Sequence, residues 1–153
     1  MKFTLLTALL SLASIVSYGV EGATSTIELK AVSNNSAVNG LGLSSVHEGA
    51  GINYFFLGQG SEKLTYDGVS TIYVEDSLHQ TFQVDSSILE LSVTTTYNHW
   101  TFDNNNYLAL NGSTDGFYAC KNFNDPYSYS SNEYGVLTEK VNSDCLPIKI
   151  SKA

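Results

Sequence analysis

Short runs of alternating apolar and polar residues, separated by turn-forming pairs, recur along the chain and favour β-strands over helices. β-Branched and aromatic side chains, which pack well on a pleated surface, dominate these runs. The alternation is clearest over residues 27–32, 70–75, 81–85 and 89–94. Between the runs lie four pairs that favour tight turns, because glycine adopts positive φ without steric cost: Asn39-Gly40, Asp67-Gly68, Asn111-Gly112 and Asp115-Gly116.

Two stretches read as hairpins. Residues 64–74 predict one around Asp67-Gly68, and residues 107–120 predict another with 111–116 as its loop. Spacing compatible with a helix occurs only over residues 86–91, which is long enough for one turn. Strand-like runs about eight to twelve residues apart predict a single all-β domain, an antiparallel β-sandwich or a barrel.

The first 19 residues have the features of a secretory signal peptide. Lys2 gives a positive start, residues 3–16 are apolar or small, and Ser17 and Gly19 suit signal peptidase. We therefore expect cleavage after Gly19 and a single β domain over residues 20–153. The carboxyl end lacks the long apolar tail of a lipid-anchor signal, so the product is expected to be secreted without one.

The charge of the chain argues against two classes of partner. The net charge is −8, and the chain has seven scattered lysines and no arginine. Phosphate recognition normally uses clustered Lys and Arg, with Arg giving forked contacts. We therefore expect no binding to nucleic acid and no adsorption to an anionic membrane.

The two cysteines, Cys120 and Cys145, predict one disulfide. An even pair in an oxidising compartment most simply forms a bridge, which here would close the domain and hold the long loop over residues 122–135. A redox or metal site is the alternative, but there is no Cys-x-x-Cys spacing and no neighbouring histidine to complete a ligand set.

No motif of a catalytic site occurs in the sequence. Gly-x-Ser-x-Gly is absent, and His47, His79 and His99 show no zinc-hydrolase spacing. Glycoside hydrolysis needs two facing carboxylates, and no spacing singles out a pair among Glu48, Glu75, Glu90 and Asp103. We expect a non-enzymatic protein without a metal or cofactor, although residues far apart in sequence can assemble a catalytic site.

Two oxygen-rich stretches resemble calcium loops in part. Residues 103–106 lack the glycine and the distal glutamate, and residues 111–116 have Asn122 where the glutamate would stand. We expect both to be turns.

Two Asn-x-Ser sequons, at Asn34 and Asn111, lie in polar, turn-like surroundings where a glycan can extend into water. Both are predicted glycosylation sites. Four aromatic residues, Trp100, Tyr127, Tyr129 and Tyr134, are candidate carbohydrate contacts if they are exposed, because aromatic faces pack against the apolar side of sugar rings. Tyrosines at alternate positions are equally ordinary as half-buried strand residues.

Residues 39–51, followed by Phe117-Tyr118-Ala119-Cys120 and residues 145–150, resemble the small cell-wall proteins of Candida-type yeasts. The ending also resembles the phialide-type wall proteins of filamentous fungi. This resemblance implies a secreted, glycosylated, non-enzymatic structural component of the fungal cell wall. Its implied partners are wall polysaccharide (glucan, mannan or chitin) or other wall proteins.

Two other functions stay open from the residues alone. One is an extracellular carbohydrate-binding or adhesion module that uses exposed aromatic side chains. The other is a secreted glycosidase-like enzyme, which would require two carboxylates facing each other in a cleft.

Overall fold

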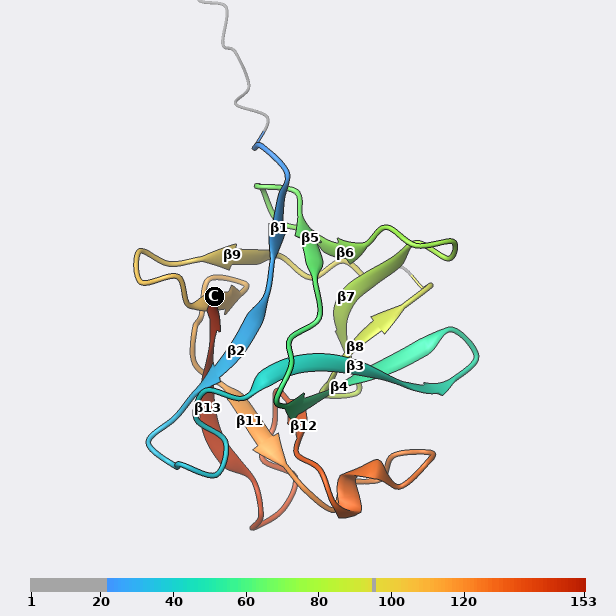
Figure 1. Cartoon of the computed structure of the whole chain (residues 1–153), viewed down its shortest axis with the longest axis vertical. Helices are drawn as coiled ribbons and strands as arrows, with labels where there is room; N and C mark the ends of the chain where they lie inside the picture. The colour runs from blue at the N-terminus through green and yellow to red at the C-terminus, as the bar shows by residue number, and fades with distance from the viewer. Residues whose placement is uncertain (1–21, 95) are drawn as a thin grey trace, which may run out of the picture.

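The computed structural model describes residues 22–94 and 96–153. The predicted signal peptide, residues 1–19, lies outside these described residues. Seven antiparallel strands close into a barrel in the order β8, β12, β11, β13, β2, β3 and β4, with β4 pairing back to β8 (Figure 1). Their bounds are β2 Leu29–Val32, β3 Gly42–Gly49, β4 Ile52–Gly58, β8 Ile88–Ser92, β11 Phe117–Cys120, β12 Gly135–Leu137 and β13 Leu146–Lys152. The prediction of an all-β fold is confirmed, and the barrel is the architecture adopted.

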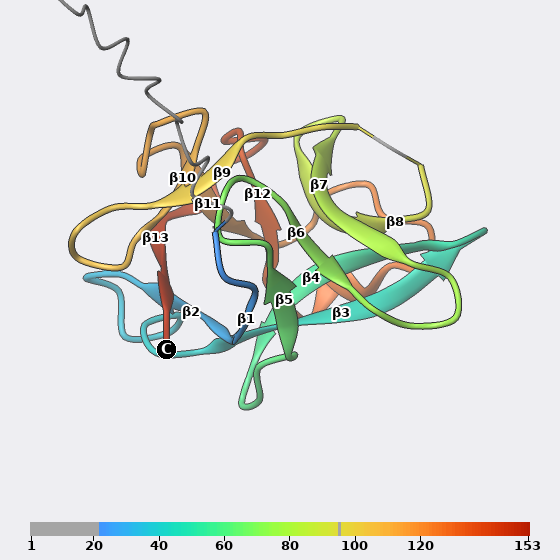
Figure 2. The same ribbon diagram turned by 90° about the horizontal axis from the view of Figure 1, so that it is seen from above.

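Four further strands extend the sheet beyond β8. They follow in the spatial order β7, β6, β5 and β1, and lie above the barrel in Figure 1. A separate pair, β9 and β10, lies beside β13, as Figure 2 shows from above. The bounds are β1 Ser25–Ile27, β5 Leu64–Tyr66, β6 Ile72–Val74, β7 Gln80–Asp85, β9 Trp100–Phe102 and β10 Leu108–Leu110. No described segment forms a helix with the length and apolar character needed to cross a membrane.

Alternate residues of the strands fill the barrel interior. Phe55 and Leu57 of β4 belong to the buried core, so Phe56 between them faces outward. Phe55 packs edge-on against Phe82 of β7, with ring centroids 5.0 Å apart. Each fully buried large apolar side chain contributes about 1.5–3 kcal/mol, and this interior is the main source of stability.

The first predicted hairpin is confirmed. β5 and β6 pair antiparallel, and Gly68 in the connection has a φ of 79°. The Asp67 carboxylate accepts hydrogen bonds from the backbone N–H groups of Val69, Ser70 and Thr71 at 2.8–2.9 Å. Burial raises the pKa of Asp67, but these hydrogen bonds outweigh it and lower the pKa below the ordinary value.

The second predicted hairpin, over residues 107–120, is wrong. β10 pairs with the preceding β9, while β11 pairs with β12 and β13. Asn111 and Gly112 both have positive φ, 51° and 86°, and form a two-residue turn closed by the bridge between Leu110 and Ser113. This turn ends the short β9–β10 pair. The chain then continues from Ser113 into the barrel wall, where Phe117 and Ala119 are buried.

Two other local expectations change in the structure. Residues 27–32 do not form one strand, because β1 ends at Ile27 and pairs with β5, while β2 starts at Leu29 and pairs with β13. Residues 86–91 contain no helical turn. Ser86 and Ser87 instead connect β7 to β8 as a two-residue turn, with φ values of 47° and 69°.

Candidate functional site

The loop between the two cysteines folds back onto the outer face of β3 and β4. Phe56 of β4 stacks with Phe123, with ring centroids 6.1 Å apart, and meets Tyr129 edge-on at 6.0 Å. His47 of β3 stacks with Tyr127 at 6.2 Å. These aromatic side chains of residues 122–135 therefore lie on the outer face of β3 and β4.

Two features hold this loop in place. The predicted disulfide between Cys120 and Cys145 is present, with Cα atoms 4.1 Å apart, and it joins the end of β11 to the start of β13. Within the loop, Asp125 accepts hydrogen bonds from the Ser130 hydroxyl and from the Ser130 N–H at 3.3 Å. These bonds tie the 3₁₀ turn Tyr129–Ser131 to the preceding part of the loop.

Three of the predicted carbohydrate contacts lie on this loop, but only two share a surface. Tyr127 and Tyr129 are 56% and 39% exposed, and their ring centroids are 6.2 Å apart. We call these two side chains the tyrosine shelf. Tyr134 is half-buried against the core, and the Lys121 Nζ lies 4.7 Å from its ring centroid. Tyr134 is therefore not part of the shelf.

Trp100, the fourth predicted carbohydrate contact, is not exposed. Its side chain is 1% exposed, and its ring packs edge-on against Phe82 with centroids 4.9 Å apart. The indole N–H donates a hydrogen bond to the Phe82 carbonyl at 2.9 Å. A tryptophan that satisfies its polar atom inside the protein is most stable in the core, which corrects the prediction.

Glu48 is buried beneath the loop, although sequence reasoning offered it only as one acid among several. Its Oε2 accepts a hydrogen bond from the Tyr127 N–H at 3.0 Å. Its Oε1 is buried and has no partner within the described residues. Burial raises the pKa of Glu48 above its ordinary value of 4.5, and the neighbouring Asp125 carboxyl adds to this effect. The charged form of this carboxyl is therefore less favourable than it would be in water.

The other candidate acids are dispersed. Glu90 of β8 is buried and accepts a hydrogen bond from the Gln83 amide at 2.9 Å, and its burial raises its pKa. Glu75 is exposed and lies 3.6 Å from the Nδ1 of His79. Asp103 accepts backbone hydrogen bonds from Asn105 and Tyr107 in the turn between β9 and β10. These four glutamate and aspartate candidates thus occupy four different settings.

The three histidines do not meet one another. His47 lies 3.4 Å from the Asn53 amide oxygen, His79 pairs with Glu75, and His99 is exposed. Among residues 22–94 and 96–153, no three His, Cys, Asp or Glu side chains converge as a metal-ligand group. Both calcium-like stretches form turns, as expected: Asn106 has a φ of 63° in the first, and Asn111 and Gly112 turn the second.

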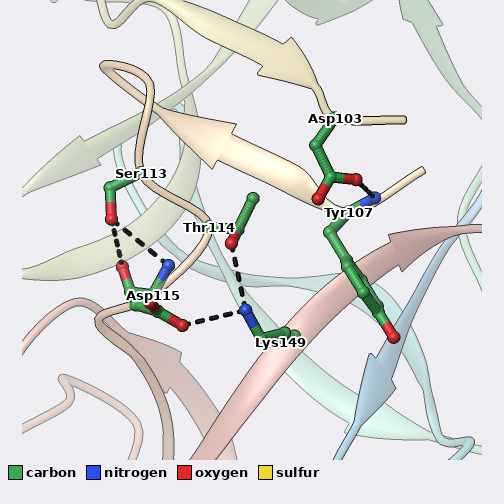
Figure 3. A network of polar contacts seen from close by, with 6 residues as sticks. All are labelled: Asp103, Tyr107, Ser113, Thr114, Asp115 and Lys149. Carbon is green, nitrogen blue, oxygen red and sulfur yellow. Dashed lines mark hydrogen bonds and ion pairs between the residues drawn. The ribbon is translucent and has the colours of Figure 1, made fainter. Parts of the chain in front are cut away.

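A groove of about 580 Å³ lies beside the sequon at Asn34. Asn34 and Asp115 line it, and Asn111 precedes Asp115 in the same loop. Lys149 donates hydrogen bonds to Thr114 Oγ1 at 3.0 Å and to Asp115 Oδ1 at 2.9 Å, and lies above the Tyr107 ring (Figure 3). The bond with Asp115 raises the pKa of Lys149. This ion pair is largely exposed, so it orders the loop more than it stabilises the fold.

Another groove, of about 510 Å³, was not anticipated from the sequence. It lies between β4, the β7–β8 turn and the disulfide-closed loop, and we call it the Phe123 groove. Its apolar wall is formed by Tyr54, Ile88, Phe123, Leu137 and Val141. Its polar positions are Ser86, Asn122, Asn124 and Asn142. The wall of this groove comes from segments far apart in sequence, so no local pattern predicts it. The one local signal is the Asn-rich composition of residues 122–124.

Comparison with known proteins gives one family. A family described as a domain of unknown function, DUF7907, matches residues 24–152. The chain belongs to this family. No solved structure matches it significantly.

Three curated relatives come from Candida albicans and are all named cell wall proteins. The cell wall protein RHD3 is 39% identical over 82% of this chain and 64% of its own length. The cell wall proteins PGA30 and PGA31 are each 35% identical over 98% of this chain, and the match covers 54% and 52% of their lengths. The DUF7907 chain thus spans between about half and two thirds of these relatives. The resemblance to Candida-type wall proteins is confirmed, and it supports a cell-wall or extracellular location.

Proposed function

We propose that this DUF7907 protein is a secreted, glycosylated, non-enzymatic structural component of the fungal cell wall. The observation that carries the proposal is the shared sequence with three wall proteins over most of this chain. The dispersal of the histidines and candidate acids supports a non-enzymatic role, because catalysis needs acid, base or nucleophile held within mutual reach. Wall polysaccharide or other wall proteins are its proposed partners.

The positions of the two sequons support glycosylation. Asn34 and Asn111 are exposed, as are Ser36 and Ser113, which complete the sequons. Neither Asn34 nor Asn111 belongs to the tyrosine shelf, so glycans on them would not replace its aromatic surface. N-linked sugars on these loops would face water without displacing core residues.

Fractionation of a yeast culture tests the wall proposal. The epitope-tagged protein is followed in the medium, the detergent-extractable wall and the alkali-released wall, with and without endoglycosidase treatment. We expect most of it in a wall fraction, with Asn34→Gln and Asn111→Gln each removing one glycan step on a gel. Asn104→Gln, an exposed asparagine outside any sequon, is the matched control. Protein found entirely in the medium would contradict the wall role, and an unchanged gel position would contradict glycosylation.

Carbohydrate binding is a second candidate function, and the tyrosine shelf is the observation that favours it. Two exposed tyrosine rings held on a pinned loop give a surface on which sugar rings can pack. Pull-down on insoluble β-glucan, chitin and mannan tests this function. The double variant Tyr127→Ala/Tyr129→Ala should bind less. Tyr97→Ala is its control, since Tyr97 is a tyrosine outside the loop that is 83% exposed.

A further inference from the structure

We propose that the Phe123 groove is a binding site for a short neutral saccharide. The inference rests on the second function proposed above, carbohydrate binding, and assigns it to a place other than the tyrosine shelf. The groove, at about 510 Å³, lies in the usual range for small-ligand sites.

The chemistry of the groove suits a sugar ring because it is apolar on one side and rich in amides on the other. A pyranose has C–H faces that pack on apolar side chains, and hydroxyl groups that both donate and accept hydrogen bonds. Tyr54 and Phe123 supply flat aromatic surface, and the Asn124 amide carries a donor and an acceptor. The Asn122 amide already donates to Asp144, and the Asn142 amide already bonds to the loop backbone.

The charges favour a neutral ligand. None of the residues that line the groove is charged. The groove therefore offers an anionic ligand no cation to pair with. Burial raises the pKa of Tyr54, and the nearby Glu90 and Glu48 raise it further, so acidic side chains lie close to this wall. An acidic or phosphorylated sugar would be repelled there.

The groove is held in shape before any ligand arrives. Phe123 stacks on Phe56 and lies over Gly135, where even a Cβ atom would come within 2.4 Å of the Phe123 ring. The Asn142 amide nitrogen donates to the Lys121 and Asn122 carbonyls at 2.8 and 3.3 Å. The disulfide fixes both segments, because Cys120 precedes Asn122 and Cys145 follows Asn142. Such preorganisation lowers the entropy lost on binding.

One amide faces the groove with its hydrogen-bonding capacity unused. Asn124 is exposed, and its side chain makes no hydrogen bond within the described residues. It is thus available to a sugar hydroxyl. Because no pair of carboxylates lines the groove, the arrangement can hold a saccharide but lacks the acid and the base or nucleophile of glycoside hydrolysis.

Calorimetric titration of the secreted protein with hexasaccharides of β-glucan, mannan and chitin tests the proposal. We expect one of them to bind, with affinity about three- to tenfold weaker in Asn124→Ala, which removes one hydrogen-bonding side chain without touching the core. Phe123→Ala should weaken binding at least as much. Asn104→Ala, an exposed amide in the β9–β10 turn, is the matched control and should leave the affinity unchanged.

A variant of the tyrosine shelf distinguishes the proposed groove from the proposed carbohydrate-binding function. If the double variant Tyr127→Ala/Tyr129→Ala loses binding while Asn124→Ala and Phe123→Ala keep it, the groove is overturned and carbohydrate binding stands. If none of the three oligosaccharides binds, both the groove and the carbohydrate-binding function are overturned, while the structural wall role is untouched. Loss in the groove variants with an intact shelf variant supports the groove.

Discussion

At the residue scale, Glu48 shows how one side chain couples the barrel to its longest loop. The carboxyl accepts the Tyr127 N–H from a residue 79 positions away and lies beside Asp125 in a setting closed to water. Burying a charged carboxylate there is unfavourable, so Glu48 loses its proton at a higher pH than it would in water. The loop that carries the tyrosine shelf is therefore attached to a carboxyl whose pKa is raised.

We predict that Glu48→Gln flattens the dependence of stability on pH. The raised pKa of Glu48 means that the folded state binds the proton more tightly than the unfolded state. The proton on Glu48 therefore stabilises the folded state fully when the pH is below the ordinary pKa of 4.5. This stabilisation is lost as the pH rises through the raised pKa of the folded state. Glutamine cannot titrate, and its amide can donate toward Asp125 while accepting from Tyr127.

Urea unfolding of both proteins between about pH 4 and pH 7 measures this effect. The variant should gain stability relative to the native protein as pH rises. Glu75→Gln, which changes an exposed acid, is the control. An equal loss of stability at both ends of the range would show that Glu48 does not titrate as we infer.

At the element scale, the two-residue turn of the β7–β8 hairpin has a strained backbone. Ser86 and Ser87 both adopt positive φ, a conformation that favours asparagine and glycine in two-residue hairpin turns. The Ser87 carbonyl also accepts the Thr138 N–H at 2.8 Å, so the turn is held from outside. Tertiary contacts therefore select a turn that the residues alone do not favour.

We predict that Ser87→Gly stabilises the protein by about 0.5–1 kcal/mol, because glycine removes the steric penalty at positive φ and keeps the carbonyl. Thermal unfolding should shift upward by about 1–4 °C for a chain of this size. Ser151→Gly, in the extended strand β13, should act in the opposite direction. A fall in stability for both variants would contradict the strain at Ser87.

The disulfide belongs to the same scale, since it joins two strands and closes the loop between them. We predict that the double variant Cys120→Ala/Cys145→Ala lowers the free energy of unfolding by about 3 kcal/mol, as expected for a loop of 25 residues. Denaturant unfolding of the variant should coincide with that of the reduced native protein. A variant as stable as the oxidised native protein would show that the bridge does not constrain the unfolded chain.

At the scale of the whole molecule, the apolar residues form a closed barrel whose outer surface carries two separate grooves and the tyrosine shelf. The sequon at Asn34 lines one groove, while the disulfide-closed loop borders the other. Neither Asn34 nor Asn111 lines the Phe123 groove, so glycans on them would not be attached inside it.

We predict that the secreted protein begins at Val20, since Ser17 and Gly19 satisfy the small-residue preference of signal peptidase. Amino-terminal sequencing of protein recovered from the wall or the medium checks this. Ser17→Arg should block processing, and retention of residues 3–16 in the native secreted product would contradict the signal assignment.

The sequence by itself determined the features that depend on a few neighbouring residues. Alternation gave strands near 70–75, 81–85 and 89–94, Asp67-Gly68 predicted the β5–β6 turn, and the two cysteines predicted their bridge. Only the tertiary structure decided which strands pair, since β10 pairs with β9 outside the barrel while β11 lies in the barrel wall between β12 and β13. It also placed Trp100 in the core and assembled the Phe123 groove, since burial and convergence depend on segments that meet only when the whole sheet has closed.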